Sequence, residues 1–178
     1  MSKAVLISIR PKWCEKIASG EKTIEIRKTR PKLQPPFKCY IYCTMDHPYI
    51  SVSCGELDKR NCRTNTVGRC NGKVIGEFMC DTYVTDKTFG HDALFNAAAC
   101  MNESDVVAYS AGSPIYGWHI TDLKIYDAPR ELGELRRACP NSFYCESCAM
   151  YRENDGTCGN ESLQIKRAPQ SWCYVEEM

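Results

Sequence analysis

The segment Gly20–Lys28 brings a cation, a carboxylate and a second cation close together as Lys22, Glu25 and Arg27. Residues two apart in a strand share a face, so Glu25 and Arg27 point one way and the neighbouring isoleucines point into a core. Such cations can bind phosphate or a carbonyl oxygen. The carboxylate can accept from a base amino group or act as a general base. The alternative is an ordinary solvated strand face with a weak ion pair.

The elements directly upstream must position these side chains. Residues 4–9 have the pattern of a strand, and Pro11 suits the first position of a helix that ends at Gly20. The connections are tight, so the helix amino end, Ser8 and Arg10 are expected near the polar segment. Helix amino ends carry free N–H donors and partial positive charge, which attract phosphate or carboxylate.

Several motifs occur in order along the chain. Ser-Ile-Arg-Pro at 8–11 precedes a short helix and Gly-x-Lys-x-x-Glu-x-Arg at 20–27; Gly72–Phe78 and Tyr116–Ile120 follow as a strand and an aromatic strand. Together they resemble the ASCH domain, a relative of the PUA RNA-binding barrel. The resemblance implies an α+β fold, namely a PUA-like small mixed β-barrel with short peripheral helices, and an RNA- or nucleotide-binding function.

The remaining pattern agrees with several strands and few helices. We expect one domain over residues 1–178, since 178 residues suffice for one sizeable core. Residues 45–72 lack periodicity and are predicted to be a loop insertion. The other predicted elements are strands at 38–44, 74–85, 115–126 and 171–176, and one or two short helices within 91–111.

Charge is distributed unevenly. The first 38 residues contain ten Lys or Arg against three Glu, a net charge of +7, although the whole chain carries +1. This favours an anionic partner near the amino-terminal third, and nucleic acid is the obvious class. A scattered solvated surface is the alternative, because lysines are common on all protein surfaces.

Thirteen cysteines is a high number for this length. The amino terminus lacks an apolar run long enough for a signal peptide, and no segment could span a membrane, so we expect a cytoplasmic protein without disulfides. Cys139, Cys145, Cys148 and Cys158 form a cysteine-rich loop at 139–158 with a central Cys-x-x-Cys. Four thiolates suit a structural zinc ion, whereas a redox pair at the Cys-x-x-Cys is the less favoured reading. The scattered cysteines suit small buried positions.

The first functional hypothesis is a non-catalytic RNA or nucleotide-binding module. Its expected ligand-binding residues are Ser8, Arg10, Lys22, Glu25, Arg27, Tyr116 and Trp118. The two aromatic residues share one strand face and could stack on bases. Trp13, on the apolar face of the first helix, is expected to be buried rather than stacking on a base.

The resemblance also implies an alternative, because some small ASCH proteins are amidohydrolases that act on acetylated cytidine. Lys22 matches their lysine, but Glu25 stands where they have a nucleophilic threonine, and Thr23 is not equivalent to it. In this alternative the catalytic residues would be Lys22 and Glu25, with Glu25 activating water and Lys22 or Arg27 stabilising the oxyanion. Glu77 is a candidate for the family's second glutamate. A similar modified nucleoside is an equally open substrate, and a protein-scaffold role is a third hypothesis.

Overall fold

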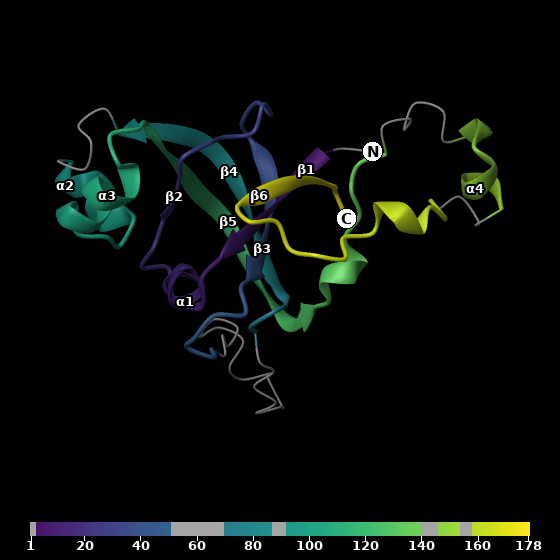
Figure 1. Ribbon diagram of the computed structural model, residues 1–178, viewed down its shortest axis with the longest axis horizontal. Coiled ribbons are helices and arrows are strands. Elements are labelled where there is room, and N and C mark those ends of the chain that lie inside the picture. The colour runs from purple at the N-terminus through teal and green to yellow at the C-terminus, as the bar shows by residue number, and fades with distance from the viewer. Residues whose placement is uncertain (1–2, 51–69, 87–91, 140–145, 154–157) are drawn as a thin grey trace.

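The computed structural model describes residues 3–50, 70–86, 92–139, 146–153 and 158–178. In these ranges the chain forms a mixed sheet with short helices around it (Figure 1). The strands are β1 (Lys3–Ile9), β2 (Ile24–Arg27), β3 (Phe37–Cys43), β4 (Val74–Asp86), β5 (Ile115–Arg130) and β6 (Trp172–Glu176). The α-helices are α1 (Pro11–Ala18), α2 (Ala93–Ala98), α3 (Glu103–Ser110) and α4 (Ala149–Arg152). This confirms the α+β class.

The six described strands lie in the order β2-β5-β4-β3-β1-β6. The pair β1–β3 is parallel, whereas β1–β6, β2–β5, β3–β4 and β4–β5 are antiparallel. The long strands β4 and β5 run through the middle of the molecule, with α2 and α3 at one end and α4 at the other (Figure 1). The predicted strands and the two helices within 91–111 are therefore present, with ends shifted by a few residues.

The expected β-barrel is wrong in one respect, because the sheet is open: β2 and β6 are its two edges. β2 has four residues, and the loop that follows contains Pro31, Pro35 and Pro36, which lack the N–H a strand ladder needs. Side chains bring the two ends of the sheet together instead. Trp118 of β5 and Trp172 of β6 have ring centres 6.0 Å apart. We call the line where β2 faces β1 and the start of β6 the seam.

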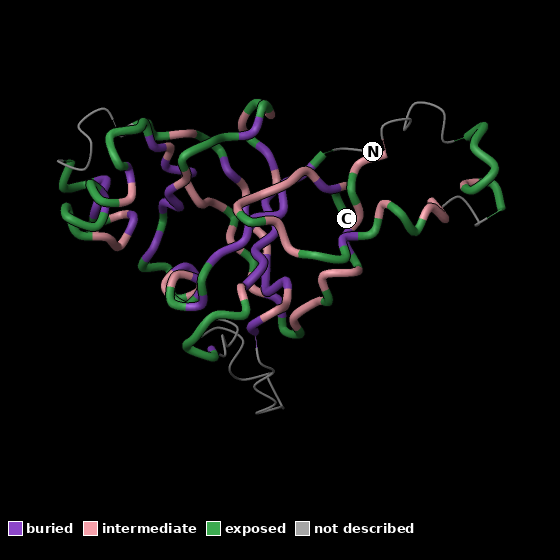
Figure 2. Tube along the Cα trace, in the orientation of Figure 1, coloured by how far each residue is buried: buried purple, intermediate pink, exposed green. Residues whose placement is uncertain are grey.

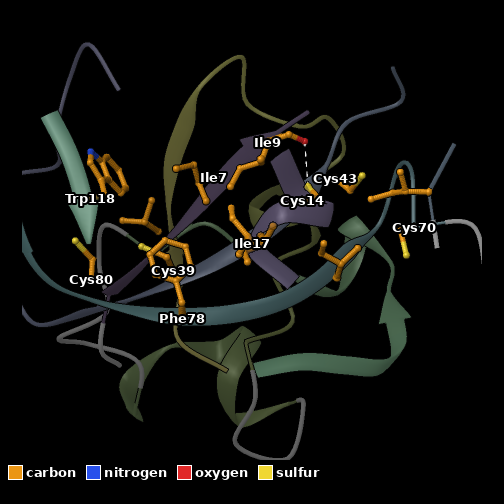
Figure 3. Packing of buried hydrophobic residues seen from close by; sticks show 14 of the residues in the cluster. Ile7, Ile9, Cys14, Ile17, Cys39, Cys43, Cys70, Phe78, Cys80 and Trp118 are labelled. Atoms are coloured by element: carbon orange, nitrogen blue, oxygen red, sulfur yellow. Dashed lines mark hydrogen bonds between the residues drawn. The ribbon is translucent and has the colours of Figure 1, made fainter. Parts of the chain in front are cut away.

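Buried residues follow the sheet through the centre of the molecule (Figure 2). The main core cluster contains Val5, Ile7, Ile17, Ile41 and Phe78, with α1 packed against it (Figure 3). Five thiols, Cys14, Cys39, Cys43, Cys70 and Cys80, are buried in the same cluster. The prediction of small buried positions is therefore confirmed for these five scattered cysteines, whereas Cys100 and Cys173 are only half-buried. Burial raises the pKa of Cys14 and Cys39 well above the ordinary thiol value.

A separate small core fixes β2. Ile24 and Ile26 pack with Phe95, Val106 and Ile115 of the α2, α3 and β5 region. The predicted alternation of β2 is therefore confirmed, because its isoleucines are buried on one side and its polar residues face the other. Asn102 caps α3 by accepting from the Asp105 N–H at 2.7 Å, which holds this helical end of the molecule in place.

Two predicted features fall partly outside the described residues. Of the predicted insertion at 45–72, residues 51–69 lie outside them, and so do residues 140–145 and 154–157 of the cysteine-rich loop. Within the described ranges, no helix has the length and apolar character needed to cross a membrane.

Candidate functional site

A cavity of about 780 Å³ opens at the seam. Its walls come from the end of β1, the start of α1, β2 with the residues after it, α3, and residues 170–171 just before β6. Ser8, Arg10, Lys22, Glu25 and Arg27 all line it. The structure thus brings together five of the seven predicted ligand-binding residues. This volume is in the usual range for a small-molecule site.

Lys22, Glu25 and Arg27 form a buried ion triad in this cavity. Lys22 Nζ lies 3.4 Å from Glu25 Oε2, and Arg27 Nη2 lies 3.1 Å from Glu25 Oε1. The exposed fractions of the three side chains are 2%, 7% and 12%. One carboxylate therefore stands between two cations, and the triad keeps a net positive charge toward the cavity.

The local sequence explains why Lys22 is aimed inward. Gly20 has φ +79, a left-handed conformation that glycine adopts without strain, and it ends α1 in a sharp turn. The Lys22 N–H then donates to the Lys16 carbonyl at 2.9 Å. Lys22 Nζ also donates to the Ala99 carbonyl at 2.7 Å, so the ammonium is fixed by the end of α2 as well as by Glu25.

Arg27 connects the two sides of the seam. Its Nη2 donates to the Ser8 carbonyl at 2.5 Å, while its Nε is buried and has no hydrogen-bond partner in the described structure. Ser8 is itself held by residues before β6: its N–H donates to the Ser171 carbonyl at 2.9 Å, and its hydroxyl donates to the Pro169 carbonyl at 2.6 Å. Among the described residues Arg27 Nε thus has no acceptor, and the Ser8 hydroxyl, which donates to Pro169, keeps its lone pairs.

The cavity's other charged residues lie nearer to solvent. Arg10, Lys12 and Lys28 are exposed cations in its wall, and Asp46 and Asp105 are exposed carboxylates. Counting the buried triad, five cations face three carboxylates. The excess of positive charge favours an anionic ligand, with the most accessible cations at the entrance.

The amino end of α1 has fewer free backbone N–H donors than expected. Pro11 has no N–H, and the N–H groups of Trp13 and Cys14 both donate to the Arg10 carbonyl, at 2.9 and 3.0 Å. Among the first helical residues only Lys12 retains an N–H for a ligand. The expectation of a helix end rich in free donors is therefore wrong, because the Arg10 carbonyl accepts two of the N–H groups and Pro11 has none.

The expectation that Trp118 binds ligand is also wrong. Trp118 is fully buried, and the rings of Phe37, Tyr83 and Trp172 surround it with centre distances of 6.0 Å. Tyr116 shares its face but does not line the cavity; it is half-buried beside Arg27, its cross-strand partner. The rings from β3, β4 and β6 therefore cover Trp118, whereas Tyr116 stays partly accessible.

Trp13 behaves differently from the expectation of full burial. It packs partly against the main core but also lines the cavity, with Lys12 Nζ 4.2 Å and Lys22 Nζ 5.0 Å from its ring centre.

Glu77, the candidate second glutamate, lies on β4 outside the cavity. It accepts from the Tyr126 hydroxyl at 2.6 Å.

Sequence reasoning missed several wall residues from distant segments, among them Asp46, Tyr109 and Gln170. Nothing in their local sequence marks them, since only the fold brings residues around 46, 109 and 170 to the seam. For Lys12 and Lys28 the only signal in the sequence was the general excess of basic residues in the amino-terminal third.

The zinc prediction is only partly within the described structure. Cys139 and Cys158 are half-buried, Cys148 is exposed, and Cys145 lies outside the described residues. The Cys139 N–H donates to Glu176 at 3.4 Å, and the Cys158 carbonyl accepts from Arg136, so the flanks of the loop are anchored near each other. No three potential ligands are grouped around a metal position within the described ranges. Four thiol donors nevertheless suit zinc by type.

No family model and no curated protein sequence matches the chain. Solved structures do. A crystal structure of ASCH from Zymomonas mobilis has a TM-score of 0.55 and 16% identity, covering 98% of this chain and 88% of that one. A mutant of the same protein, ZmASCH, has a TM-score of 0.58 and 16% identity, covering 99% of this chain and 92% of the other. This protein therefore has the fold of these ASCH crystal structures.

Proposed function

We propose that this protein binds RNA or a nucleotide in the seam cavity. The observation that carries the proposal is the buried Lys22–Glu25–Arg27 triad at the cavity wall, with further cations toward solvent. The ASCH fold supports the same class of ligand, since that fold is related to an RNA-binding barrel. A nucleotide combines an anionic phosphate, which suits the exposed cations, with a polar base edge, which suits the buried triad.

Each part of the ligand has a suitable group. Arg10, Lys12 and Lys28 would meet phosphate near the entrance, where binding costs little desolvation. The Arg27 guanidinium would donate to an acceptor on the base or sugar, and Glu25 would accept from a base amino group while holding its two cations in place. Trp13 offers an aromatic surface in the same wall.

Hydrolysis of acetylated cytidine or a similar modified nucleoside is a second candidate. It is favoured by the 3.4 Å contact between Lys22 and Glu25 inside the cavity, where a carboxylate could activate water. However, both Glu25 oxygens face cations, and Glu77 lies outside the cavity. Binding without turnover is therefore the better supported function.

The test compares Arg27→Ala with Arg130→Ala in binding to single-stranded RNA oligomers and to nucleoside 5′-monophosphates. Arg27 lines the cavity, whereas Arg130 lies over Tyr126 against a different core cluster and serves as the matched loss of one arginine. Loss of a hydrogen bond to a charged group should weaken binding about 10- to 100-fold in Arg27→Ala alone. Equal affinities of the two variants, or no binding by the wild-type protein, would refute the proposal.

We also propose that Cys139, Cys145, Cys148 and Cys158 hold one structural zinc ion. The support is the type and number of the donors and the anchoring of both flanks of the loop. The ion would stabilise the segment that leads into β6 and would take no part in ligand chemistry.

A further inference from the structure

We propose that a second, shallower subsite adjoins the seam cavity, formed by Arg30, Tyr83 and Tyr116, and that it takes the neighbouring nucleotide of a single-stranded RNA. One nucleotide would fill the cavity and the next would stack at this subsite. The inference rests on the proposed function and deepens it, because it makes the ligand a polynucleotide of at least two residues rather than a free nucleotide.

The subsite combines an accessible guanidinium with two aromatic rings. The Arg30 guanidinium carbon lies 5.4 Å from the Tyr83 ring centre and 5.7 Å from the Tyr116 ring centre. Arg30 is exposed, and both tyrosines are half-buried. Guanidinium planes and aromatic rings are the surfaces on which proteins stack unpaired bases. Arg30 lies over both rings, so a base would stack on the outer face of the exposed guanidinium, with the two tyrosine rings behind it.

The loop that carries Arg30 is fixed on both sides. Trp172 Nε1 donates to Thr29 Oγ1 at 3.0 Å, and the Lys32 N–H donates to the Tyr174 hydroxyl at 2.7 Å. Both aromatic partners belong to β6, so the loop is fastened to an edge of the sheet on either side of Arg30. Such anchoring lowers the entropy that binding must remove.

The subsite is continuous with the cavity. Thr29 lines the cavity and Arg30 follows it directly in the chain. Tyr116 is the cross-strand partner of Arg27, another cavity residue, and paired residues in antiparallel strands share a face. A nucleic acid strand that leaves the cavity past Arg27 and Thr29 therefore meets Tyr116 and Arg30 next.

The charge of this region suits a phosphate backbone rather than a neutral peptide. Lys28, Arg30 and Lys32 are exposed on one loop, and the sequence has no acidic residue between Glu25 and Asp46. Phosphates on either side of the stacked base would meet these cations.

The experiment is calorimetric titration of wild-type protein, Arg30→Ala and Arg130→Ala with nucleoside 5′-monophosphates and with 5′-phosphorylated RNA dinucleotides. Stacking of one base on an aromatic surface contributes enough for the wild-type protein to bind the dinucleotide about tenfold more tightly than the mononucleotide. Arg30→Ala should remove most of this advantage and leave mononucleotide affinity unchanged. Arg130→Ala loses the same charge from an arginine 4.7 Å from the Tyr126 ring centre, and it should keep the advantage.

The subsite is refuted if the wild-type protein binds both ligands equally or if Arg30→Ala retains the full dinucleotide advantage. The proposed function survives that result provided that mononucleotide binding is still weakened in Arg27→Ala. If the wild-type protein binds neither ligand, the proposed function fails and the subsite fails with it.

Discussion

Arg27 donates a 2.5 Å hydrogen bond to the carbonyl of Ser8 across the seam, although β2 and β1 are not paired in the sheet. A side chain thus joins β2 to β1, which backbone hydrogen bonds between strands would do in a closed barrel. The same side chain contacts Glu25, so the fold's closure and the candidate site depend on one residue.

Glu25→Gln should destabilise the protein by about 3–5 kcal/mol, because it leaves Lys22 and Arg27 buried without their shared counter-charge. Urea unfolding followed by circular dichroism measures the loss. Glu21→Gln is the matched control: that carboxylate pairs with Lys16 at the surface, and its removal should change stability little. Equal stability of Glu25→Gln and wild-type protein would show that the triad does not need the carboxylate charge.

Incubation with acetylated cytidine and a panel of modified nucleosides should give no product, because the carboxylate of Glu25 faces cations through both oxygens. Chromatographic separation of nucleosides measures turnover. Product formed by the wild-type protein but not by Lys22→Ala would instead establish the hydrolase alternative and locate its chemistry at the triad.

Affinity for single-stranded RNA should fall steeply with salt, since phosphate contacts release counterions. Lys12→Ala and Lys28→Ala should each reduce the slope of log affinity against log salt by about one, because both residues line the cavity near solvent. Fluorescence anisotropy over a salt series measures the slope. Lys124→Ala, an exposed lysine outside the cavity, should leave it unchanged, and a reduction as large as that in Lys12→Ala would argue against a localised phosphate site.

Stability should fall as pH rises above about 9. Burial raises the pKa of Cys80 to about 12 from 9.0, so the unfolded chain loses this proton first and alkaline pH favours unfolding. The stabilisation from the retained proton is complete below pH 9 and is lost between about pH 9 and 12. Urea unfolding at several pH values should show Cys80→Ala with a shallower decline, by up to about 1.4 kcal/mol per pH unit. Cys100→Ala, which removes a half-exposed thiol, should follow the wild-type curve.

Protein prepared without chelator should contain stoichiometric zinc, and Cys148→Ser should lower both the zinc content and the melting temperature. Elemental analysis and thermal unfolding measure these effects. Cys100→Ser, a cysteine outside the loop, should do neither. Absence of zinc from the wild-type preparation would overturn the zinc prediction.

Local sequence was sufficient for the elements that position the triad. Pro11 and Gly20 mark both ends of α1, and period-two alternation assigns the faces of β2. These signals are local because caps, turns and strand alternation depend on neighbouring residues. The sequence therefore predicts that Lys22, Glu25 and Arg27 lie close together, but it does not predict how deeply they are buried.

The errors arose where distant segments meet. Alternation places Tyr116 and Trp118 on one face, but Trp118 is covered because rings from β3, β4 and β6 meet around it in the folded chain. Likewise Tyr109 and Gln170 enter the cavity wall because α3 and the residues before β6 arrive there in the folded chain. Barrel closure was overpredicted for the same reason, since edge pairing depends on three-dimensional spacing.

Because the seam is closed by side chains, it can widen without the loss of any backbone ladder. The bonds that join its two sides include Arg27 to Ser8 and Trp172 to Thr29, and both are made by groups that can rotate. Substitution of Arg27 or Trp172 would therefore remove contacts between the two sides of the seam and leave every strand pairing of the sheet in place. In a closed barrel the same two edges would be joined by backbone hydrogen bonds, so the contacts across the seam depend on side-chain identity in a way that a strand ladder does not.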